Sequence, residues 1–85
     1  MIEVRNPGVL AATIEIDLVR FHRAATMFRM PVALDEFART LAKVAEMLRE
    51  AEARGQAVDL GDEVVRVIHQ FRGALSTVGG APAQA

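Results

Sequence analysis

The sequence predicts an all-α fold, in which an antiparallel helical hairpin and a long N-terminal helix form a three-helix bundle. Three segments, residues 7–29, 34–54 and 60–78, repeat their apolar residues at helical steps of three and four. Proline and glycine residues separate these segments. Apolar residues make up 52% of only 85 residues, and a chain this short buries about 60% of the surface that its unfolded form exposes. We therefore expect one domain, residues 1–79, that is completed by dimerisation.

The first predicted helix spans residues 7–29. Asn6 is a favoured N-cap residue, Pro7 suits the first helical position, and Pro31 discourages continuation of the helix. The main apolar stripe of this helix consists of Leu10, Ile14, Leu18, Phe21, Ala25 and Phe28.

A β-hairpin is the alternative for residues 1–19. Residues 14–18 alternate apolar and acidic side chains, and the turn at residues 6–8 could connect them to a strand that contains Ile2 and Val4. The alternation lasts five residues, whereas the helical stripe has six members over nineteen residues. The longer pattern favours the helix.

A second apolar stripe lies on the same helix, interrupted by Arg23. Its members are Ala12, Ile16, Val19, Met27 and Met30. A helix that is apolar on two faces needs two surfaces to pack against. We expect the second stripe to be the interface of a homo-oligomer, and we expect that oligomer to be a dimer.

The second predicted helix spans residues 34–54 and has the most regular pattern. Its apolar residues fall at alternating steps of three and four, as in the seam of a helical hairpin: Leu34, Phe37, Leu41, Val44, Leu48 and Ala51. Gly55 supplies a C-terminal stop. The pair of Asp35 and Arg39, four residues apart, indicates that the outer side is solvated.

The third predicted helix spans residues 60–78. The short connection before it predicts that it runs antiparallel to the second helix, so that residues 34–78 form the hairpin. Its apolar stripe is Leu60, Val64, Ile68, Phe71, Leu75 and Val78, and the opposite stripe is Asp62, Arg66, His69, Gly73 and Ser76. After Gly79 and Gly80 no large side chain remains to be buried, so residues 80–85 are expected to be a disordered tail.

The composition argues against several functions. The chain has no cysteine, and its two histidines, His22 and His69, lie far apart, so we expect no metal site and no cofactor. With 10 basic and 11 acidic residues the net charge is −1, which argues against nucleic-acid binding.

The most apolar segment, residues 9–19, is too short to span a bilayer, and the first five residues do not resemble a secretory signal. We expect a cytoplasmic protein without membrane contact.

One short motif suggests chemistry. Residues 69–73 read His69-Gln70-Phe71-Arg72-Gly73, and Val78-Gly79 follows. This pattern resembles the region around the phosphorylated histidine of histidine phosphotransfer (HPt) domains, which act in bacterial phosphorelays. The resemblance covers residues 69–79.

The resemblance implies a role for each residue of the motif. It would make His69 the phosphoacceptor, Phe71 a core residue and Arg72 a basic group near the phosphoryl group. Gly73 would give clearance for a receiver domain. The family's bundle has four helices, and a second copy of the chain would have to supply those that this chain lacks. The implied chemistry is reasonable, because an exposed neutral imidazole is a competent nucleophile near pH 7.

Two functions follow from these patterns. The favoured one is a small non-catalytic adaptor or assembly protein that binds itself and another protein. The alternative is a phosphorelay intermediate that carries a phosphoryl group on His69 and has receiver domains as partners. No Ser-His-Asp set, pair of catalytic carboxylates or phosphate-binding glycine loop can be assembled from the residues present, which argues against an enzyme.

Overall fold

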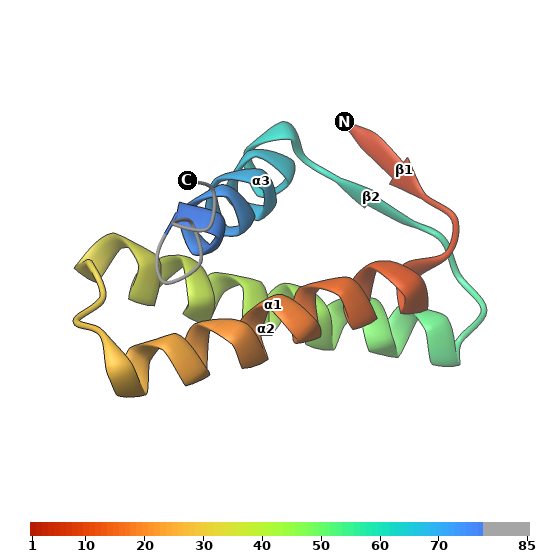
Figure 1. Ribbon diagram of the computed structural model, residues 1–85. Coiled ribbons are helices and arrows are strands. Elements are labelled where there is room, and N and C mark those ends of the chain that lie inside the picture. Colours follow the sequence, from red (N-terminus) through yellow and green to blue (C-terminus); the bar gives the residue numbers. More distant parts are fainter. Residues whose placement is uncertain (78–85) are drawn as a thin grey trace.

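The computed structural model describes residues 1–77. The elements follow the order β1 (Ile2–Val4), α1 (Pro7–Met27), α2 (Val32–Ala53), β2 (Val58–Leu60) and α3 (Asp62–Thr77) (Figure 1). The prediction of a mostly helical fold with three helices is confirmed. The expected tail, residues 80–85, lies outside the described residues, as does Val78-Gly79 of the histidine motif.

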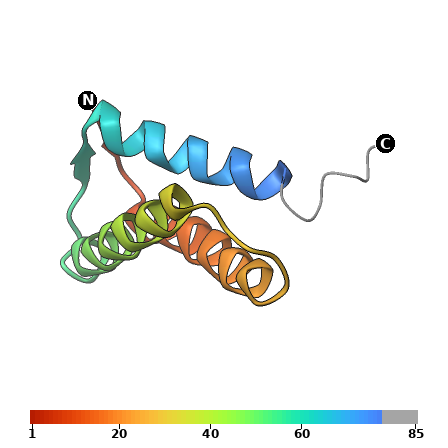
Figure 2. The same ribbon diagram turned by 90° about the vertical axis from the view of Figure 1, so that its left-hand side faces the viewer.

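Helices α1 and α2 form the closest helix pair. They run side by side and antiparallel, and α3 lies across one side of the pair (Figures 1 and 2). The chain turns between them at Phe28, whose extended backbone ends α1, and at Pro31, which precedes α2. The predicted hairpin of residues 34–78 is therefore replaced by an α1–α2 hairpin.

The connection from α2 to α3 explains this difference. Gly55 has a φ of +69°, and the N–H of Gln56 donates to the carbonyl of Ala51 over 2.9 Å, which is a Schellman stop. The chain then extends as β2 before α3 begins. A strand between the two helices moves α3 away from α2, so α3 crosses the α1–α2 pair instead of continuing a tight hairpin.

Strand β1 combines features of the two alternatives for residues 1–19. Ile2 and Val4 do lie in a strand, and α1 begins at Pro7 as predicted. The partner of β1 is β2, in an antiparallel register that pairs Ile2 with Leu60 and Val4 with Val58. This contact joins the N-terminal residues to the segment that directly precedes α3 and so fixes the start of α3.

The core lies where the three helices meet. Its buried apolar residues are Ala11, Ile14, Phe21, Leu34, Ala38, Leu41, Ala45, Leu48, Leu60, Ile68, Phe71 and Leu75. Phe71 of α3 is fully buried, and its ring lies 5.5 Å from that of Phe21 of α1, centroid to centroid. Within residues 1–77 no helix is both long and apolar enough to cross a membrane.

Candidate functional site

Helix α1 carries an exposed apolar surface, which we call the α1 face and define as Val9, Ala12, Ile16, Val19 and Met27. Between 53% and 75% of the surface of each residue is exposed, except for Ala12, which is partly buried. The face includes four of the five predicted interface residues. The fifth, Met30, packs against the core, because α1 ends at Met27 and the helical spacing no longer applies beyond it.

Two acidic residues on either side of Ile16 fix the orientation of this face. At 3.6 residues per turn, Glu15 and Asp17 lie about 100° to either side of Ile16. Glu15 bonds to α2 and Asp17 bonds to α3. Ile16 therefore points away from both neighbouring helices. A shallow groove of about 380 Å³ runs along the middle of the face, lined by Ala12, Glu15, Ile16, Val19, Arg20 and Arg23.

Besides the apolar core, a bidentate ion pair connects α1 and α2. Arg49 donates from Nε to Oε2 of Glu15 over 3.0 Å and from Nη2 to Oε1 over 2.7 Å. Its remaining nitrogen, Nη1, lies 3.3 Å from Oε1 of Glu52. The hydrogen bonds and the positive charge of Arg49 hold the pKa of the Glu15 carboxyl below its usual value. Glu15 is thus ionised at neutral pH beside the groove.

The ion pair between α1 and α3 has a more buried carboxylate. Only 5% of the Asp17 side chain is exposed, and its Oδ2 accepts a hydrogen bond from Nε of Arg72 over 3.1 Å. Arg20 approaches the other carboxylate oxygen at 3.6 Å. A buried carboxylate is costly unless it is paired, so Arg72 is a structural partner that allows Asp17 to lie under α3.

The histidine motif lies on the outer side of α3. His69 is exposed, and α3 continues without a break through Gly73 to Thr77. A Cβ atom added to Gly73 would meet nothing within 4 Å, so the surface beside His69 is open. Arg72, the basic group of the motif, is turned toward Asp17, although about half of its side chain remains exposed.

The histidine and carboxylate side chains of the described residues are not grouped as metal ligands. Within residues 1–77 no group of three or more histidine and carboxylate side chains could hold a metal ion. His22 is exposed, and its ring contacts that of Phe21 edge to face at 5.5 Å.

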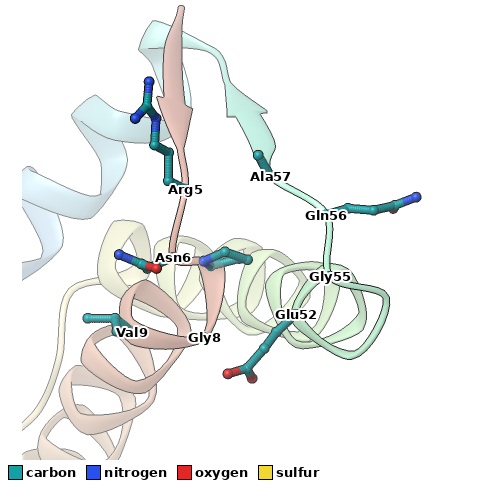
Figure 3. Close-up of a pocket in the computed structure, with 9 residues that line it drawn as sticks. Arg5, Asn6, Gly8, Val9, Glu52, Gly55, Gln56 and Ala57 are labelled. Atoms are coloured by element: carbon teal, nitrogen blue, oxygen red, sulfur yellow. The ribbon is translucent and has the colours of Figure 1, made fainter.

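A second pocket, of about 360 Å³, lies where the start of α1 meets the end of α2 (Figure 3). The Glu52 carboxylate occupies the space beside Gly8, where a Cβ atom would overlap it. Arg5 and Gln56, also in the lining, point away from each other (Figure 3). The position of the Glu52 carboxylate therefore explains the glycine at position 8. The side chains that line the pocket do not converge on a reactive site.

Neither ion pair could be predicted from the sequence, because they join residues 34 and 55 positions apart. The only local signal was the alternation of residues 14–18. A period of two is typical of a strand, but here it places two acidic side chains on opposite sides of a helix.

Comparison with known proteins adds no relative. No protein-family model matches the chain, no curated protein matches it, and no solved structure matches it.

Proposed function

We propose that this protein is a small non-catalytic assembly protein that associates with itself through the α1 face and, in that assembled form, binds another protein. One observation carries the proposal: the most exposed large apolar side chains of α1 lie together on one side of the helix, turned away from its own core. Apolar surface that is removed from water contributes about 25 cal/mol per Å², and contiguous exposed apolar surface marks interaction sites.

The small size of the domain and the shape of the groove support the same function. A domain of this size has a small core, and association with a second chain is a common way to bury further apolar surface. The groove along the face is shallow, and two of its charged lining residues, Glu15 and Arg20, belong to ion pairs. These features suit contact with another helix better than the enclosure of a small molecule.

The Ile16→Asp variant is expected to lose self-association. An unpaired carboxylate in an apolar interface costs several kcal/mol, and each 1.4 kcal/mol changes the dissociation constant about tenfold, so we expect a weakening of at least about 100-fold. Sedimentation equilibrium at micromolar concentration should give a dimer for the unchanged protein and a monomer for the variant.

Met47→Asp is the matched control, because Met47 is an exposed apolar residue of α2 outside the α1 face. It should leave the dimer intact. Ile16 is 61% exposed in the single chain, so the variant should keep its helical circular dichroism. A monomeric unchanged protein, or a dimer that survives Ile16→Asp, would refute self-association through this face.

Phosphotransfer on His69 is the second candidate function. Two observations favour it: His69 is exposed, and the surface at Gly73 is open enough for a partner to approach. In this reaction a nitrogen of the neutral imidazole attacks the phosphorus of a receiver aspartyl phosphate. The P–N bond forms, the P–O bond breaks and the aspartate carboxylate leaves.

If this second function holds, a phosphorylated receiver domain should transfer an acid-labile, base-stable phosphoryl group to the protein. His69→Gln should abolish the labelling, whereas His22→Gln, which changes the other exposed histidine, should not. Gly73→Gln should also block the transfer by crowding the approach, while its helicity should be unchanged or higher. Labelling that persists in His69→Gln, or the absence of labelling by any receiver domain, would exclude this function.

A further inference from the structure

We propose that the α1 face binds the α1 face of a second copy with the two helices antiparallel, about a twofold axis between Ile16 and Val19. This inference rests on the proposed function, because it specifies the partner and the geometry of the assembly. It follows from how apolar and charged residues are distributed along α1.

The spacing on α1 suits packing against another helix. Six positions follow alternating steps of three and four: Val9, Ala12, Ile16, Val19, Arg23 and Thr26. All are exposed except Ala12, which is partly buried. In the antiparallel arrangement Ile16 packs on Val19 of the second copy, and Val9 lies opposite Thr26. The most apolar part of the face is then at the centre of the interface.

The charges of the face differ between its two ends. The C-terminal half carries Arg20 and Arg23, whereas the N-terminal half of α1 has no basic side chain and is flanked by Glu15. Glu15 shares Arg49 with Glu52, so that cluster has two carboxylates and one guanidinium and a net charge of −1. The acidic N-terminal end of the face is therefore complementary in charge to the basic C-terminal end of a second copy.

Arg23 decides between the antiparallel and parallel arrangements. In the antiparallel pair it lies over Ala12 of the second copy, one helical turn from Glu15. The small alanine leaves room for the hydrocarbon stem of the arginine, and the guanidinium can reach the carboxylate.

In a parallel pair each Arg23 would face Arg23 of the other copy across the seam between the two helices. Two like charges at this position repel each other. The compensating contact, between Glu15 and Arg20 of the second copy, would lie at the rim. Exposed ion pairs there contribute little to affinity. The antiparallel arrangement is therefore favoured.

Disulfide trapping tests this geometry without a background reaction, because the chain has no cysteine. Two single variants of the full chain are needed, Val9→Cys and Thr26→Cys. The two positions are seventeen residues apart, about 25 Å along the helix. One variant is labelled with ¹⁵N, so that mass spectrometry distinguishes mixed disulfide dimers from dimers of one variant.

Antiparallel packing predicts mixed disulfide dimers when the two variants are combined and oxidised, and at least a tenfold lower yield when either variant is oxidised alone. Adding Ile16→Asp to both variants should abolish the mixed dimers, and an Arg39→Cys variant on the outer side of α2 should not form them with either partner. Efficient disulfide formation by each variant alone would show a parallel pair. That outcome overturns this inference but leaves self-association through the face intact.

If sedimentation shows a dimer that gives neither disulfide pattern, the antiparallel inference is also wrong. If the protein is monomeric and no disulfide forms, the proposed function fails together with the inference. The two failures are thus distinguished by the sedimentation result.

Discussion

The Phe71→Ala variant is expected to be about 3 to 5 kcal/mol less stable than the unchanged protein. Phe71 is fully buried and contacts Phe21, so the substitution removes a large apolar side chain and leaves a cavity between α3 and α1. For a domain of this size each kcal/mol lowers the melting temperature by about 4 to 8 °C. The expected fall is therefore at least about 12 °C.

Urea unfolding followed by far-ultraviolet circular dichroism measures this loss, since the chain has no tryptophan or tyrosine to serve as a fluorescence probe. All variants must be compared at one protein concentration, because association adds to apparent stability. Gln70→Ala is the control, since Gln70 is the exposed neighbour on the same helix. If Phe71→Ala unfolds at the same urea concentration as Gln70→Ala, α3 does not pack on α1 as described.

Replacing Arg72 with methionine is expected to cost about 2 to 3 kcal/mol. Removing one partner of a buried ion pair typically costs about 3 to 5 kcal/mol, because the remaining charge stays buried without compensation. The expected loss is smaller here, since about half of the Arg72 side chain is exposed and Arg20 lies 3.6 Å from the Asp17 carboxylate. The same urea experiment measures it.

The double variant Asp17→Leu/Arg72→Met separates the pair from the packing of its hydrocarbon groups. With both charges removed there is no buried carboxylate to compensate, so the double variant should be more stable than Arg72→Met alone. A double variant at least as unstable as the sum of the two single changes would show that Asp17 and Arg72 do not interact.

The stability of Arg72→Met also bears on the histidine motif. A loss of stability would indicate that Arg72 is needed to hold α3 on α1, whatever His69 does. A residue can serve both purposes, but phosphotransfer measurements on Arg72 variants must then be corrected for unfolded protein. His69→Gln and Gly73→Gln do not carry this difficulty, because both positions are exposed.

The sequence by itself determined where the helices lie. Pro7 starts α1, Gly55 ends α2, and steps of three and four between apolar residues mark one buried side on each helix. These signals are local, since they depend on backbone angles and on the helical repeat within a few residues. For the same reason Ile16 and Val19 could be assigned to a second face of α1 before the structure was known.

Only the tertiary structure decided which helices pair and what the charged residues do. Helix α2 pairs with α1 and not, as predicted, with α3. This pairing depends on the β1–β2 contact, which joins residues 2–4 to residues 58–60. Asp17 and Arg72 likewise meet only because α3 crosses α1 at that point. A repeating apolar pattern specifies that a helix side is buried but not against which helix or at which angle, because Leu, Ile and Phe pack on any apolar neighbour of suitable shape.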